Sequence, residues 1–312
     1  MKTIVIAIGG NSLIQDARHQ SVPDQYAAVV ETVRHITDLL ERYHRIVITH
    51  GNGPQVGFIL LRSEHSRGLL HQVPLDSIVA DTQGALGYQL QQALENEFRR
   101  RGLRKSVATV VTQTLVDHDD PAFGKPAKPI GQFYTREQAE DRMRVEKWNM
   151  VEDAGRGWRR AVASPKPIRI LESAVVRHLV KDGYVIVAAG GGGIPVVADA
   201  QGMLSGVAAV IDKDLASAVL AKEIGADLLV ISTSVEKVCL NYGKPNQRAV
   251  DSMTVAEARR FISEMHFQPG SMLPKVEACV QFVAGGGREA IITCPEALSA
   301  ALAGHTGTHI VP

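Results

Sequence analysis

Apolar residues recur along the chain in two patterns, as short continuous runs and as helical repeats. Runs such as TIVIAI and LLVIS are dense in β-branched residues, which is typical of strands buried on both faces. Between such runs, apolar residues return every three or four positions, as they do on one helix face between Val29 and Leu40. Ser21, with Asp24 three residues later, predicts a cap at the start of that helix.

The pattern predicts strands and helices in alternation. Strands are expected within 3–10, 45–53, 106–114, 184–193, 226–233 and 289–294, and helices within 21–40, 75–100, 215–225, 255–262 and 275–283. This alternation favours an α/β fold, in which helices cover both faces of a parallel sheet. From about 118 to 166 the pattern breaks, because the chain becomes rich in Pro, Gly, Lys, Arg and Asp. A long irregular segment inside a compact fold is usually a functional lid or flap, or is disordered.

Bulk composition narrows the class of protein. The chain has 312 residues, of which 45% are hydrophobic and 21% charged, as in ordinary globular proteins. Its formal net charge of +1 argues against nucleic acid or a membrane surface as a partner. The 3 cysteines are far apart in sequence, so neither a disulfide framework nor a zinc site is expected. Without a signal-like segment or a long apolar run, a cytoplasmic protein is expected.

Glycine clusters follow three of the predicted strands, at 9–11, 51–53 and 190–193. Ligands of parallel sheets bind beyond the carboxyl ends of the strands, so the clusters share one crevice if these strands are neighbours. Glycine lets backbone N–H groups approach an anion without a Cβ in the way. One cluster alone is more simply a turn, but three together predict an oxyanion site.

The common nucleotide motifs are missing, so positive charge must come from elsewhere. Neither GxxxxGK[ST] nor a complete GxGxxG occurs in the chain. Lys213 stands between Asp212 and Asp214 at a predicted helix start, where an acid is also a plain cap. Lys275 stands at a second predicted helix start, and Lys125 and Lys128 lie in the irregular segment. Each alone is more simply a solvated charge, yet their positions favour phosphate binding.

These residues resemble the carbamate kinases, a branch of the amino acid kinase family. The resemblance covers essentially the whole chain, through AIGGNSL, THGNGPQVG, DPAFGKPAKPIGQFY, GRGWRRAVASPKP, GGGGIPV, AVIDKDLASA, NYGKP, HFQPGSMLPKVEA and GHTGTHI. It implies a single domain over 1–312, a three-layer αβα sandwich around a mainly parallel sheet. The acyl-substrate half would be about 1–211 and the nucleotide half about 212–312. A small protruding lid subdomain would occupy 118–166, and the family is usually homodimeric.

The resemblance also implies roles for residues that match the family's motifs. Lys128 on the lid and Lys213 in the core would contact the transferred phosphoryl group, with Asp212 ordering the lysines. Lys275 would hold the nucleotide phosphates. The acyl phosphate would be cradled by Gly9, Gly10, Asn11, Gly51 and Asn52, and the nucleotide would be bordered by Gly191, Gly192, Tyr242 and Met272. Arg159 and Ser164 match motif positions near the lid, without a definite role.

The implied reaction is reversible phosphoryl transfer between ATP and carbamate, giving ADP and carbamoyl phosphate. Carbamate is already an anion, so charge neutralisation and positioning suffice and no general base is needed. Mg²⁺ would be bound mainly through the nucleotide phosphates, with no metal site on the protein. In catabolism such an enzyme would make ATP from carbamoyl phosphate.

One departure from the family pattern keeps alternatives open. Ser234 stands where the wider family commonly has an acid, and Glu236 is its nearest substitute. A catalytically weak paralogue that senses a nucleotide or acyl phosphate is therefore an alternative. A sister kinase for another small carboxylate is a second alternative, although the first strand lacks the lysine that such kinases often have. His50 could contact substrate, but a histidine satisfied by the backbone is the more common case.

Overall fold

Parallel strands form the centre of the structure, as the apolar runs predict. The computed structural model describes residues 2–9, 13–14, 18–40, 45–153, 155 and 157–312. Its main sheet has the order β15-β17-β16-β12-β1-β2-β9-β3, and neighbours are parallel except β16 and β17. The bounds are β15 Ser252–Thr254, β17 Thr308–Val311, β16 Glu289–Thr293, β12 Leu228–Ser232, β1 Thr3–Ile8, β2 Arg45–His50, β9 Val185–Val187 and β3 Val107–Thr109.

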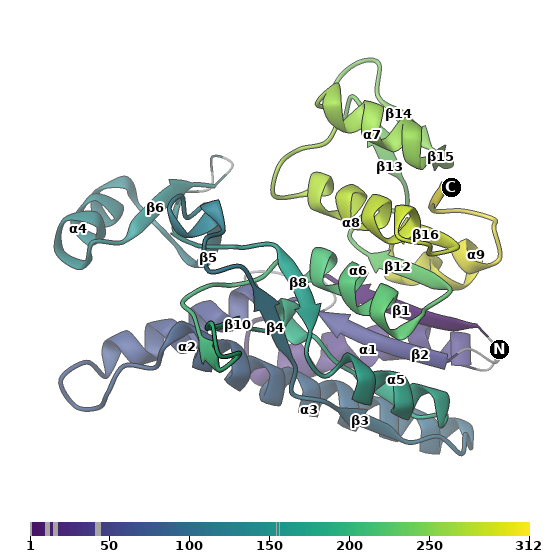
Figure 1. Ribbon diagram of the computed structural model, residues 1–312, viewed down its shortest axis with the longest axis horizontal. Helices are drawn as coiled ribbons and strands as arrows, with labels where there is room; N and C mark the ends of the chain where they lie inside the picture. Colours follow the sequence, from purple (N-terminus) through teal and green to yellow (C-terminus); the bar gives the residue numbers. More distant parts are fainter. Residues whose placement is uncertain (1, 10–12, 15–17, 41–44, 154, 156) are drawn as a thin grey trace.

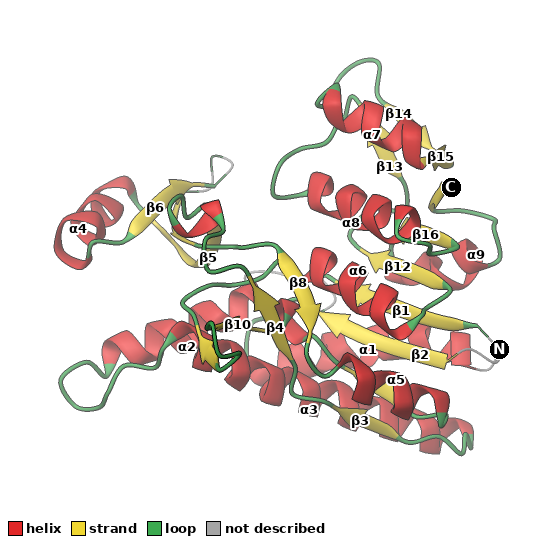
Figure 2. Ribbon diagram, in the orientation of Figure 1, coloured by secondary structure: helices red, strands yellow, loops and turns green. Residues whose placement is uncertain are grey.

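Helices cover both faces of this sheet, which confirms the predicted three-layer αβα sandwich. In β1, Ile4, Ile6 and Ile8 pack into one hydrophobic cluster, while Val5 and Ala7 pack into another. The first cluster contains residues of α1 (Val22–Leu40), α3 (Leu75–Arg101) and α9 (Leu298–Leu302). The second contains residues of α5 (Ser173–Lys181), α6 (Lys213–Ile224), α7 (Val255–Ser263) and α8 (Met272–Ala284). Figures 1 and 2 show the strands between these helical layers.

The predicted strand within 106–114 is wrong as a single element. β3 ends at Thr109, and the chain then enters a second sheet of order β11-β10-β4-β8. Between the two strands, the side chain of Gln83 binds both N–H and C=O of Thr112, which redirects the backbone. The second sheet consists of β4 Gln113–Val116, β8 Pro167–Ile170, β10 Ile194–Ala198 and β11 Leu204–Gly206.

The described residues of 118–166, a segment here called the lid, form regular elements, whereas the sequence pattern predicts an irregular segment. They contain a short helix η2 (Pro121–Phe123), an antiparallel sheet of order β5-β7-β6 and helix α4 (Arg136–Glu146). The strands are β5 Lys128–Tyr134, β6 Asn149–Glu152 and β7 Trp158–Val162. A capping box of Thr135 and Gln138 starts α4. Figure 1 shows this sheet and α4 projecting away from the main sheet.

The lid rests on helix α2 (Gly53–His65) through two glycines. A Cβ built on Gly57 of α2 would lie 2.2 Å from the Cα of Gly131 in β5. Gly131 has φ 76°, a left-handed conformation that favours glycine. Close contact between the two backbones therefore depends on the absence of a side chain at Gly57.

Smaller elements complete the chain. They are the hairpin β13 Val238–Leu240 and β14 Arg248–Val250, with short helices η3 Gly190–Gly192 and η4 Pro295–Ala297. Helix α8 begins at Met272, three residues before the predicted start, whereas the reciprocal hydrogen bonds of Ser21 and Asp24 confirm the predicted cap of α1. None of the helices within the described residues is long and apolar enough to cross a membrane.

Candidate active site

Two of the three glycine clusters frame a crevice at the carboxyl edge of the main sheet. β1, β2 and β9 are neighbours, so the prediction that their ends meet is confirmed. The N–H of Gly51 donates to the carbonyl of Ile8 at 3.2 Å, which holds the first two ends together. Gly9 borders an open cavity at this edge. Gly10 and Asn11 fall outside the described residues.

The third cluster is buried and has a packing reason for its glycines. Gly191 and Gly192 have φ 67° and 90°. A Cβ on Gly191 would lie 2.0 Å from Nδ2 of Asn52, and one on Gly190 would lie 2.5 Å from Nε2 of His50. The backbone of this cluster thus packs against the side chains of Asn52 and His50. Gly191 and Gly192 are not among the described residues that line the cavities around the loop before α8. Their contact with a nucleotide stays a prediction.

The start of α6 joins the lid to the core through Asp212. This residue caps the helix, and its Oδ1 accepts from the N–H groups of Asp214 at 2.9 Å and Leu215 at 3.4 Å. Its Oδ2 lies 3.2 Å from Nζ of Lys128, which also donates to the carbonyl of Ile211 at 3.1 Å. The predicted partnership of Asp212 with a lysine is therefore present, and that lysine is the one on the lid.

The other two lysines meet on a different carboxylate, Asp214. Its Oδ2 lies 3.0 Å from Nζ of Lys275 at the start of α8, and its Oδ1 pairs with Lys213. Asp214 is buried, with only 2% of its surface exposed. Lys213 continues past Gly51, where a Cβ would lie 3.4 Å from its Cδ. One carboxylate therefore fixes two cations beside the strand ends.

Burial and charge act against each other in this cluster. Burial alone would raise the pKa of Asp212, but the ammonium groups of Lys128, Lys213 and Lys275 hold the pKa well below its usual range. Burial lowers the pKa of Lys213, while the carboxylate of Asp214 acts in the opposite direction. With three lysines and two carboxylates, the cluster carries a surplus positive charge that suits a phosphate.

His50 supports the crevice from below. Burial lowers its pKa to about 4, although the carbonyl of Gly51 opposes this shift. Its Nδ1–H donates to that carbonyl at 2.9 Å. The imidazole is 1% exposed. It is thus a neutral histidine satisfied by the backbone, the simpler of the two alternatives.

Three cavities meet around the loop before α8, and Ser271 borders all of them. The first, of about 300 Å³, is lined by Ser234, Tyr242, Met272 and Lys275 with other residues. The second, of about 450 Å³, reaches from the same loop to Gly9 and Lys213. Tyr242, Met272 and Lys275 therefore line one cavity, and Lys275 also lines the next one together with Lys213.

The third cavity, of about 860 Å³, separates the lid from the core. Lys128, Arg159 and Ser164 line its lid side, and Asp212 lines its core side. Arg159 is fixed within the lid, because it donates to the carbonyl of Gly131 at 3.1 Å and to Asp153 at 2.9 Å. The groove is continuous from Tyr242 to the lid, and its walls bring cations from three separate segments together.

Comparison with known proteins agrees with this geometry. The sequence profile of the amino acid kinase family matches residues 2–294. The chain belongs to the amino acid kinase family. It is 52% identical to the carbamate kinase-like protein YahI of Escherichia coli, over 99% of this chain and 98% of that one. It is 46% identical to a carbamate kinase of Thermococcus kodakarensis, over 100% of this chain and 99% of that one.

A solved structure of this family has the same fold. Carbamate kinase from Giardia lamblia bound to AMP-PNP superimposes with a TM-score of 0.92 and 40% identity, and the match covers 99% of this chain and 98% of that one. The sandwich and the projecting lid are thus features of a fold already seen around a nucleotide analogue in a relative.

Asp214 and Ser271 are site residues that the sequence does not single out. Asp214 is visible only as an acid flanking Lys213, and its inward direction depends on the turn of α6. Ser271 directly precedes α8, but its place between three cavities depends on how α8 packs. Neither placement has a local signal in the chain.

Proposed function

We propose that this protein is a carbamate kinase, which transfers a phosphoryl group reversibly between ATP and carbamate. The observation that carries the proposal is the convergence of Lys128, Lys213 and Lys275 on two carboxylates beside the strand ends. The relatives named carbamate kinases support it, because they match this chain over nearly its whole length.

Phosphoryl transfer between ATP and carbamate requires charge neutralisation more than proton transfer. Carbamate and ATP are both anions, so the barrier to their approach is largely electrostatic. Lys128 would contact the transferred phosphoryl group from the lid and Lys213 from the core. Lys275 would hold the nucleotide phosphates.

Substrate positions follow from the two ends of the groove. Carbamate or carbamoyl phosphate would lie against Gly9, Gly51 and Asn52, with Gly10 and Asn11 completing the cradle. Asn52 supports this loop, because its buried side chain donates to Thr82 at 2.8 Å. The nucleotide would lie along Tyr242 and Met272.

Mg²⁺ would be bound through the nucleotide phosphates. Within the described residues, His, Cys, Asp and Glu form no group of three that would hold a metal. Asp212 and Asp214 are already paired with lysines. Such a donor set fits a hydrated Mg²⁺ that arrives with its nucleotide, because Mg²⁺ often keeps several waters and substrate phosphates as ligands.

The assembly and compartment are further proposals. The protein would be a cytoplasmic homodimer. Pairing of its subunits through α3 is supported by Tyr88, an aromatic residue of that helix that is 63% exposed. Sedimentation of wild-type protein and of Tyr88→Lys tests the interface. A dimer that is unaffected by the substitution would place the contact elsewhere.

ATP formation from ADP, Mg²⁺ and carbamoyl phosphate tests the function, with acetyl phosphate in parallel. Fast ATP formation from carbamoyl phosphate alone is the expected result. Equal or faster reaction with acetyl phosphate would favour the sister kinase. The pH and salt should match between the two reactions, because surface charge attracts both anions.

A weak paralogue that binds without turnover is the second candidate, favoured by one observation. Ser234, and no acid at that position, borders the two cavities beside Lys275. Calorimetry of ADP binding separates this candidate from an inactive preparation. Tight ADP binding with no ATP formed from either acyl phosphate would favour the sensor, and Ser234→Asp is then the first variant to assay.

A further inference from the structure

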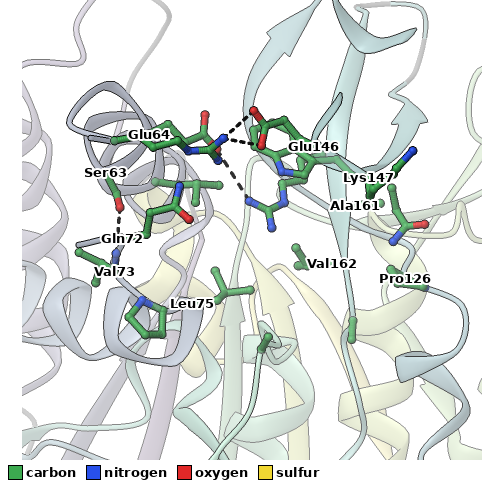
Figure 3. Close-up of a pocket in the computed structure, with 18 of the residues that line it drawn as sticks. Ser63, Glu64, Gln72, Val73, Leu75, Pro126, Glu146, Lys147, Ala161 and Val162 are labelled. Carbon is green, nitrogen blue, oxygen red and sulfur yellow. Dashed lines mark hydrogen bonds and ion pairs between the residues drawn. The ribbon is translucent and has the colours of Figure 1, made fainter. Parts of the chain in front are cut away.

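A further cavity, here called the α2–lid cavity, lies on the other side of the lid from the active-site groove. It measures about 660 Å³ and is enclosed by α2, the segment leading into α3, and lid residues from α4, β6 and β7. Figure 3 shows Glu64 reaching toward it from the side of α2 and Glu146 from the side of the lid. The proposed phosphoryl transfer uses none of the residues that line it.

Glu64 contributes an unsatisfied acceptor to this cavity. Its side chain is 9% exposed, and neither carboxylate oxygen has a hydrogen-bond partner within the described chain. Burial raises the pKa of Glu64, although the guanidinium groups of Arg142 and Arg160 oppose the shift. A buried carboxylate without donors is costly, so a donor supplied by a ligand would stabilise it.

Arg160 contributes unsatisfied donors to the same cavity. Its Nη1 lies 3.9 Å from Oε1 of Glu64, which is beyond hydrogen-bond distance. Its guanidinium carbon lies 4.5 Å from the ring centroid of Trp148, and this stacking fixes the plane of the group. The structure gives its N–H groups no hydrogen-bond acceptor among the described residues.

The neighbouring charges are already satisfied. Both carboxylate oxygens of Glu146 accept from Nη1 of Arg67, at 2.8 and 2.7 Å. This pair links the segment that follows α2 to the end of α4. Glu64 and Arg160 therefore stand out as an ion pair in the wall of one cavity that lacks a hydrogen bond between its members or to the other described residues.

We propose that this cavity binds a small zwitterion of the α-amino-acid class, with its ammonium group on Glu64 and its carboxylate on Arg160. The two charged groups of an amino acid sit on one carbon, so both fit beside protein atoms that are 3.9 Å apart. Charge-assisted hydrogen bonds of about 2.8 Å would form on each side. Val73, Leu75 and Val162 provide apolar wall for the rest of the ligand.

The site is connected to the catalytic lysine of the lid through one sheet. Arg159 and Arg160 are successive residues of β7 and point to opposite faces. Arg159 therefore lines the active-site groove, and Arg160 lines the α2–lid cavity. Lys128 of β5 is the register partner of Val162 in β7. A ligand held between Glu64 of α2 and Arg160 of the lid would therefore alter where Lys128 sits.

Isothermal titration of the full-length protein with each common L-α-amino acid, one at a time, tests the site. Acetate and methylammonium serve as probes that each carry only one of the two charges. At least one amino acid is expected to bind, and both single-charge probes are expected to bind more weakly by about tenfold or more. Absence of binding by every amino acid would mean that the cavity holds solvent only, and the proposal would be overturned.

Variants locate the binding. Glu64→Gln and Arg160→Gln should each weaken it by about tenfold or more, whereas Glu140→Gln on the exposed face of α4 should leave it unchanged. Glu64→Gln removes a buried charge, so thermal unfolding is expected to show an intact fold. Equal affinity in Glu64→Gln and wild type would place the ligand elsewhere. A bound amino acid that leaves the Michaelis constant for carbamoyl phosphate unchanged would support the site and contradict its link to Lys128.

Discussion

Nζ of Lys128 lies 3.2 Å from Oδ2 of Asp212, and this contact joins the lid to the start of α6. A lysine on a projecting sheet is thus held at the place where Lys213 and Lys275 enter from the core. Because Asp212 is also the helix cap, the lid's cation is positioned by the same residue that sets the end of α6. A phosphate entering the groove would meet cations on more than one side.

Replacement of Lys128 by alanine should lower turnover by about a hundredfold or more, because it removes one charge from the transition state. ADP affinity should stay nearly unchanged, since the nucleotide cavity is lined by other residues. Steady-state ATP formation and ADP calorimetry measure the two effects. Lys125→Ala, an exposed lysine of the same lid, is the matched control. Equal turnover in both variants would remove Lys128 from the mechanism.

Asp214→Asn should impair both stability and the alkaline limb of activity. It leaves two lysines without their shared counter-ion, and loss of one partner from a buried pair costs about 3 kcal/mol. The pKa of Lys213 is already lowered by burial and would fall further, so activity should decline at lower pH than in wild type.

Urea unfolding and a pH–rate profile check the Asp214 variant. Asp251→Asn is the comparison, because it breaks an exposed ion pair with Lys237 and should change the free energy of unfolding little. An unchanged alkaline limb would show that Lys213 does not depend on Asp214 for its charge.

His50 should make the protein less stable as pH falls. Its pKa is about 4 in the fold against 6.5 when exposed, so the unfolded state takes up the proton first. Stability from this group is complete above the unfolded pKa and is lost as pH falls toward the folded one. Between pH 7 and pH 5 the loss should be about 2 kcal/mol.

His50→Asn isolates this contribution, because the amide keeps a donor for the carbonyl of Gly51. Urea unfolding at both pH values should give a smaller pH dependence for the variant than for wild type. The difference between the two proteins is the relevant quantity, since other histidines titrate in both. Parallel pH dependence would mean that His50 is protonated in the fold.

Gly57→Ala should displace β5 and reduce turnover, because the new methyl group would meet the backbone of Gly131 at 2.2 Å. Overpacking of this kind costs about 1–3 kcal/mol. Gly84→Ala in α3 is the control, because nothing lies within 4 Å of its Cβ and alanine favours a helix. Thermal unfolding and the Michaelis constant for carbamoyl phosphate report the two effects. Identical behaviour of both variants would mean that the lid adapts freely.

The main sheet was predictable because buried parallel strands are continuous apolar runs. β1, β2 and β12 match their runs, and the adjacency of the glycine ends follows from parallel topology. The interruption between β3 and β4 at 110–112 was not predictable, because it depends on the side chain of Gln83 in α3, which is distant in sequence. Order in the lid was missed because its small sheet gains stability from cation–aromatic contacts such as Arg142 over Trp148 at 5.1 Å.

The candidate site was predictable in its residue types but not in its pairings. Lysines at helix starts were visible, yet the resemblance gives the ordering role to Asp212, and Asp214 is the partner of two lysines. The four glycines at 190–193 suggest an anion cradle, whereas two of them make room for His50 and Asn52. Both differences arise because partners distant in the chain decide which way a side chain points.

Because Gly57 contacts Gly131, the sequences of α2 and the lid must remain compatible with each other. An α2 taken from a relative would arrive with its own residue at the position of Gly57, where any Cβ would meet the backbone of Gly131. Chimeras that exchange 53–65 together with the lid should therefore fold more often than chimeras that exchange 53–65 alone. Crossover points for recombination between relatives should therefore lie outside α2 and outside the lid.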